Sequence, residues 1–69
     1  MKRKTIRAFA SRLAELEVEL ETASEEDRRQ EIEKTIEGIT RQFMVVAKNN
    51  LNAIFELDNE VQKLSLIHI

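Results

Sequence analysis

Glutamate pairs at helical spacing are the first side chains in this sequence that could do chemistry. Glu15 and Glu19 stand four residues apart, as do Glu21 and Glu25. Paired carboxylates can act as general acid and base, and in helical bundles inward glutamates with Glu-x-x-His motifs hold two metal ions. The sequence contains one histidine and no motif of this kind. We therefore interpret the paired glutamates as parts of a solvated acidic face.

The sequence gives equally little support for nucleophilic catalysis by serine. A serine nucleophile needs a neighbouring base, and the sole histidine, His68, falls in a terminal segment whose origin is suspect. Cysteine is absent, and a single glycine cannot build a phosphate-binding loop. The sequence therefore predicts no enzyme, no metal, no cofactor and no small-molecule substrate.

The cationic side chains gather at the start of the chain. Residues 1–14 carry five cations and no acid, a net charge of +5. Residues 15–37 carry ten acids and three cations, a net charge of −7, and the remainder is neutral. A basic end of this kind could contact the phosphate groups of nucleic acid. The candidate basic patch consists of Lys2, Arg3, Lys4, Arg7, Arg41 and Lys48.

A small nucleic-acid-associated regulator is therefore an alternative function. The formal net charge of −2 and the content of three aromatics are not typical of that class. The longest apolar stretch, Phe43–Ala47, is far shorter than the roughly 20 residues of a membrane-spanning helix. The start lacks the apolar core of a signal peptide. We expect a cytoplasmic protein with no membrane partner.

The elements that must position these side chains are helices. No proline, one glycine and 35% charged residues are typical of long amphipathic helices, so we predict an all-α fold. A first helix is predicted over about residues 4–22, where Thr5 could cap its start. Apolar side chains recur in it at spacings of three and four, which indicates one apolar face. That face consists of Ile6, Phe9, Leu13, Leu16 and Leu20.

A turn is predicted at about residues 22–25, where Ser24 is a suitable N-cap and acids follow it. Short connections place helices antiparallel, so the first two helices should form a hairpin. Arg28 and the arginine after it would then approach Glu19 and Glu21. The apolar face of the second helix consists of Ile32, Ile36, Ile39, Phe43 and Val46.

The extent of the second helix admits two arrangements. An unbroken helix over about 25–63 would be about 60 Å long, twice the length of the first, and its bare half would pair with another subunit. Alternatively, the chain breaks near Asn49 and Asn50, which tolerate caps and left-handed conformations, and a third helix over 51–63 completes a three-helix bundle. We favour the unbroken helix because neither glycine nor proline enforces a break.

Gly38 falls inside this second helix, where glycine costs about 0.5–1 kcal/mol relative to alanine. A close helix crossing over Gly38 would explain that cost. The alternative is a tolerated surface glycine, since its neighbour is charged.

Self-association is expected because a core from 69 residues without disulfides is usually marginal. The apolar run that starts at Phe43 suits a core shared by two subunits, in which Asn50 would fix the register. We predict a non-enzymatic interaction or oligomerisation module that binds itself, as a homodimer, or a partner helix. The candidate association face consists of Phe43, Val46, Ala47, Leu51, Ile54, Phe55 and Leu57.

The last six residues, 64–69, break the pattern because they are uncharged and partly β-branched. Their order matches the translation of a transposase mosaic-end adapter used in sequencing libraries. We therefore interpret residues 1–63 as one helical domain and residues 64–69 as a non-native tail. On this interpretation a third alternative is a truncated N-terminal fragment of a longer helical protein.

No family can be named from these residues. In layout alone, a hairpin that dimerises into a four-helix bundle is similar to the plasmid copy-number RNA-binding hairpin proteins. In size and hairpin layout the chain is also similar to small sporulation phosphatase regulators. The sequence matches no motif of either family, and likeness of fold does not carry function.

Overall fold

The chain folds into three helices. The structure, a computed structural model, describes the backbone of residues 2–68 and the side chains of residues 2–65. Helix α1 spans Arg3–Thr22, α2 spans Glu26–Val46 and α3 spans Leu51–His68, with no strand in the described part of the chain. The prediction of an all-α fold is confirmed. Within the suspected tail, the side chain of His68 and all of Ile69 lie outside the described residues.

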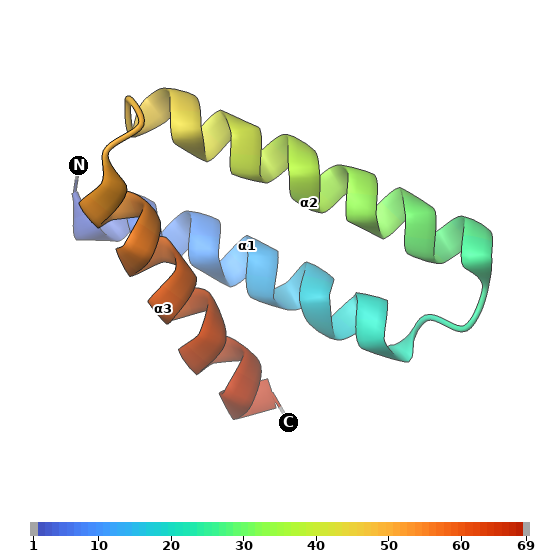
Figure 1. The fold of residues 1–69 in the computed structure, drawn as a ribbon. Coiled ribbons are helices and arrows are strands. Elements are labelled where there is room, and N and C mark those ends of the chain that lie inside the picture. The colour runs from blue at the N-terminus through green and yellow to red at the C-terminus, as the bar shows by residue number, and fades with distance from the viewer. Residues whose placement is uncertain (1, 69) are drawn as a thin grey trace.

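Helix α1 lies between the other two helices (Figure 1). The chain reverses at residues 23–25, so that α2 returns alongside α1, and α3 then starts near the N-terminal end of α1 and crosses it at an angle. The backbone of α1 lies close to α3 over a longer stretch than to α2, whereas the backbones of α2 and α3 come close at only a few positions. Both α2 and α3 are therefore held in place mainly by α1.

The favoured prediction of a long, unbroken second helix is wrong, because α2 ends at Val46. Lys48 and Asn49 have φ angles of 53° and 57°, in the left-handed region. The Lys48 N–H donates to the carbonyl of Val45 at 3.2 Å, and the Asn49 N–H donates to that of Met44 at 3.1 Å. These two bonds form a Schellman motif, which usually has glycine where this chain has Lys48. A lysine in that conformation costs about 1–2 kcal/mol.

Helix α3 begins with an asparagine cap. The Asn50 Oδ1 accepts a hydrogen bond from the backbone N–H of Asn52 at 3.0 Å, and the Asn50 carbonyl accepts one from Ile54 at 3.1 Å. This side-chain bond satisfies a donor that a helix start would otherwise leave unpaired. Asn50 is exposed, so in this fold it caps a helix and does not fix the register of a buried seam.

The starts of α1 and α2 do not use the side-chain caps that the sequence predicted. Helix α1 begins two residues before Thr5, which therefore lies inside the helix. Glu25, and not Ser24, precedes α2, and no side-chain bond caps either helix. Two acids in the first turn of α2, Glu26 and Asp27, interact favourably with the helix dipole instead.

The C-terminal end of α1 is closed by an arginine from α2. Arg29 Nη1 donates to the backbone carbonyls of Leu20 at 3.1 Å and Ala23 at 3.3 Å. Carbonyls in the last turn of a helix lack partners, and a cation there is favourable. Helix α1 has no basic residue of its own in that turn, so Arg29 ties the two helices together at the reversal.

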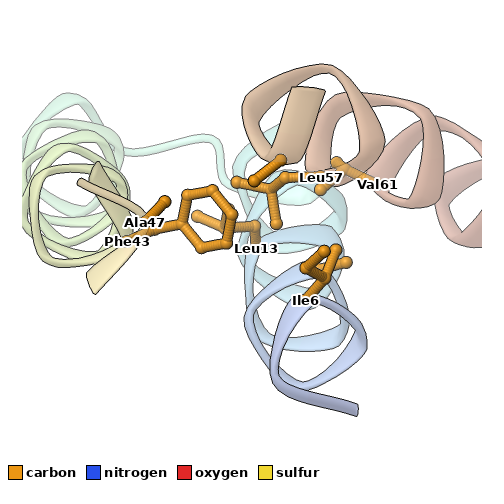
Figure 2. Packing of buried hydrophobic residues seen from close by; sticks show 8 residues of the cluster. Ile6, Leu13, Phe43, Ala47, Leu57 and Val61 are labelled. Carbon is orange, nitrogen blue, oxygen red and sulfur yellow. The ribbon is translucent and has the colours of Figure 1, made fainter. Parts of the chain in front are cut away.

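The main core forms where all three helices meet. Phe43 of α2 is the largest fully buried side chain, and its ring meets that of Phe9 edge to face, with centroids 5.2 Å apart. Figure 2 shows Phe43 reaching from α2 toward Leu13 and Leu57. The buried cluster consists of Ile6, Ala10, Leu13, Phe43, Ala47, Ala53, Leu57 and Val61.

The buried face of α1 is wider than the face that the sequence predicted. Of the predicted residues, Phe9 and Leu20 are only half-buried. Ala10 and Ala14, which the prediction left out, are 0% and 1% exposed. A helix that contacts two neighbours needs a broad apolar stripe. The alanines therefore belong to the face that lets α1 pack against two helices.

Gly38 is expected to be replaceable by alanine with a gain in stability. It lies exposed in α2, and a Cβ atom at this position would meet nothing within 4 Å, so no close helix crossing explains the glycine. We expect Gly38→Ala to raise the free energy of unfolding by about 0.5–1 kcal/mol, measured by urea denaturation. A loss of stability would contradict the exposed placement of this residue.

Phe43 and Val45 are expected to respond very differently to truncation, although they are two residues apart. Phe43 is 1% exposed and Val45 is 78% exposed. Phe43→Ala should lower the free energy of unfolding by about 3–5 kcal/mol, or abolish folding, because it leaves a cavity at the meeting point of the helices. Val45→Ala, the matched control, should change it by less than about 0.5 kcal/mol. Similar losses for both variants in thermal denaturation would show that α2 faces α1 differently.

Candidate interaction surface

Large apolar side chains remain exposed on both sides of the connection between α2 and α3. Leu51 and Phe55 are the first and fifth residues of α3, and they are 68% and 65% exposed. Residues four apart on a helix lie on the same face, so these two side chains form one apolar stripe. The exposed large hydrophobic residues are Met44, Val45, Val46, Leu51 and Phe55. We call these five the hinge-flanking residues.

The structure divides the predicted association face into two groups. Phe43, Ala47 and Leu57 are buried in the chain's own core, and Ile54 is partly buried against it. The other members of the predicted face, Val46, Leu51 and Phe55, are exposed. Only the second group is available to a partner while the fold stays closed.

Two hinge-flanking residues, Met44 and Val45, were not included in the predicted face. The sequence indicated that some apolar side chains here are exposed, because five consecutive residues from Phe43 are apolar. Successive residues on a helix are turned by about 100° from one another, so such a run cannot be buried against a single neighbour. Part of the run had to face outward.

A shallow apolar groove of about 290 Å³ lies over α1 between α2 and α3. It exists because the two outer helices touch each other only slightly. Phe55 forms part of its wall, which joins the groove to the stripe of Leu51 and Phe55. Its charged lining residues, Glu17 and Asp58, are both acidic. The lining consists of Leu13, Glu17, Ile36, Thr40, Ile54, Phe55, Leu57, Asp58 and Val61.

Some members of the predicted basic patch lie beside acids of α3. Arg3 and Arg7 line a small hollow of about 150 Å³ together with Glu56 and Glu60. Opposite charges at this range offset one another's field. A phosphate group approaching these two arginines would therefore also meet two carboxylates.

The other four residues of the candidate basic patch have different surroundings. Lys2 and Lys48 line one hollow beside the end of α2. Lys4 and Arg41 are exposed, and each stands two residues before a buried core residue, Ile6 and Phe43 respectively. A shift of two residues is about 200° around a helix, so Lys4 and Arg41 face away from the core. Of the six predicted residues, two thus line a hollow with carboxylates, two line another hollow together, and two are exposed on helix faces turned away from the core.

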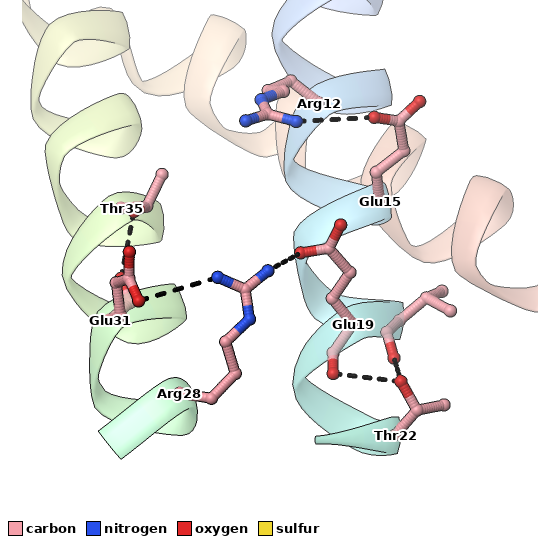
Figure 3. A network of polar contacts seen from close by, with 8 residues as sticks. Arg12, Glu15, Glu19, Thr22, Arg28, Glu31 and Thr35 are labelled. Atoms are coloured by element: carbon pink, nitrogen blue, oxygen red, sulfur yellow. Dashed lines mark hydrogen bonds and ion pairs between the residues drawn. The ribbon is translucent and has the colours of Figure 1, made fainter. Parts of the chain in front are cut away.

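Carboxylates of α1 and α2 pair with arginines across the hairpin and along each helix (Figure 3). Arg28 lies between Glu19 at 3.3 Å and Glu31 at 3.6 Å, and Arg12 lies 3.6 Å from Glu15. The predicted approach of Arg28 to Glu19 is found, whereas the next arginine bonds backbone carbonyls. Exposed pairs of this kind contribute at most about 1 kcal/mol each.

The described residues contain no group of three or more His, Cys, Asp or Glu placed to hold a metal ion. No polar or charged side chain is buried within the same part of the chain. The described surface therefore offers a partner large apolar side chains on both sides of the connection between α2 and α3, and charged side chains along the helices.

Comparison of the chain with known protein families, curated proteins and solved structures gave no match. None of the described helices is both long enough and apolar enough to cross a membrane.

Proposed function

We propose that this chain is a small, cytoplasmic, non-enzymatic helical module that works by association with a second copy or with a partner helix. The observation that carries the proposal is the exposed stripe of Leu51 and Phe55, beside an apolar groove. Exposed apolar surface that continues into a groove is typical of protein-binding sites.

Association would be favourable through the burial of several exposed apolar side chains together, not through one contact. Fully burying a leucine or phenylalanine side chain contributes about 1.5–3 kcal/mol. Association costs at least about 4 kcal/mol in lost freedom of motion. Leu51 and Phe55 are already about a third buried, so burying the rest of both would contribute about 2–4 kcal/mol per copy. Association therefore also needs the other hinge-flanking residues and the groove.

A nucleic-acid-associated regulator has weaker support. Arg3 and Arg7 share a hollow with two glutamates, and Lys4 and Arg41 are exposed on helix faces turned away from the core. Binding of a labelled RNA or DNA duplex that weakens steeply with salt would favour that alternative over the one proposed.

Polar substitution of the stripe is expected to weaken association without unfolding the chain. We expect the double variant Leu51→Gln, Phe55→Gln to associate at least about tenfold more weakly than the unchanged chain in sedimentation equilibrium. Helicity by circular dichroism should be retained, because both side chains are largely exposed. The control is Glu33→Gln, Glu37→Gln, which changes two exposed residues of α2 and should leave association unaltered. Equal association of the stripe variant and the unchanged chain would show that Leu51 and Phe55 are not the binding surface.

A further inference from the structure

The connection between α2 and α3 is held in a strained conformation. Lys48 and Asn49 both have positive φ, and neither is glycine. Asparagine tolerates this conformation, but a lysine Cβ atom lies too close to its own carbonyl there. Residues 48 and 49 would lose this strain if the chain ran straight from α2 into α3.

Five residues in or against the core, together with the exposed Asn50, would lie on one face of such a straight helix. Phe43, Ala47, Asn50, Ile54, Leu57 and Val61 follow one another at spacings of four, three, four, three and four. Four of these six residues are buried in the core and Ile54 is partly buried against it. Val46 was predicted on this apolar face, but Val46 is 50% exposed and its neighbour Ala47 is 7% exposed. With Ala47 in that position, the apolar face continues across the break between α2 and α3. The sequence thus keeps a helical period across the break.

The backbone of α3 comes close to α1 along its length and to α2 at only a few positions. The side chains of α2 and α3 meet only in the core shared with α1, where Phe43 and Leu57 lie. If α3 leaves, Phe43 is uncovered until an α3 packs on the same α1 again. The same α3 residues can pack against α1 of a second copy with every side-chain contact preserved, because the two chains are identical.

We infer that two copies of this chain exchange α3. In the exchanged dimer, residues 48 and 49 straighten, α2 and α3 form one helix, and α3 of each copy packs on α1 of the other. The inference rests on the proposed self-association and names its partner and its interface. Short hinge segments under strain favour this kind of exchange.

Exchange would also give the exposed apolar residues a partner. On a continuous helix Met44, Leu51 and Phe55 are spaced by seven and four residues, so they fall on one stripe beside the core seam. In the closed fold all three are exposed, and the break between α2 and α3 separates Met44 from the other two. In the exchanged dimer the two straightened segments lie near the symmetry axis, where these stripes can cover each other.

Substitutions in the hinge test the inference through opposite effects of glycine and alanine. Lys48→Gly, Asn49→Gly removes the strain of the closed hinge, and it should weaken dimerisation by about tenfold or more. Lys48→Ala, Asn49→Ala keeps a Cβ atom at both positions and favours a straight helix, so it should strengthen dimerisation by about the same factor. Each chain is refolded from denaturant and measured by sedimentation equilibrium. Equal dimerisation of the two variants would overturn the inference.

Cross-linking distinguishes exchange from side-by-side association. The chain has no cysteine, and the Ser65 hydroxyl donates to a Glu17 carboxylate oxygen at 3.3 Å, between α3 and α1. Glu17→Cys and Ser65→Cys chains, one of them tagged for size, are refolded together and oxidised. The control pairs Ser65→Cys with Gln30→Cys, which places the thiol at an exposed position of α2. Circular dichroism checks that each variant is helical.

Exchange predicts that the Glu17→Cys and Ser65→Cys chains form a mixed disulfide in clear excess over the control pair. A dimer in sedimentation with no such excess would overturn exchange and leave self-association standing. A chain that stays monomeric at every concentration, with a mixed disulfide no more abundant than in the control, would overturn exchange and the self-association on which it rests.

Discussion

The rest of this structure depends on the broad apolar face of α1, which packs against two helices whose backbones come close to each other at only a few positions. Ala10 and Ala14 widen that face beyond the seam that a single neighbour would need. Phe43 from α2 and Leu57 from α3 reach the same core around Leu13 (Figure 2). Because α2 and α3 do not close over each other, the groove and the exposed stripe beside them follow from the same constraint.

Much of the fold was predictable because the helical period and the charge pattern are local properties of the sequence. The all-α class follows from them, and so does the approach of Arg28 to Glu19 across the reversal. The end of α2 was foreseen only as the less favoured alternative, a break near Asn49 and Asn50 followed by a helix from residue 51, because Lys48 takes a position that usually requires glycine. A rule that looks for glycine or proline does not find such a break.

The candidate surface was predictable only in part, for a different physical reason. Periodicity indicates which face of a helix is buried, but not which chain buries it. Phe43 and Leu57 therefore looked like association residues and belong to the chain's own core, whereas Leu51 and Phe55 are exposed. The placement of Arg3 beside Glu56 could not be foreseen either, since it depends on how α3 folds back.

The slight contact between α2 and α3 has a consequence for the order of folding during synthesis. Helices α1 and α2 are joined by a short turn, so their contacts close small loops and form early. Helix α3 is the last of the three to leave the ribosome, and until it docks the face of α1 that receives it is uncovered. During synthesis, each α1 therefore presents this apolar face to its surroundings until its own α3 has been made.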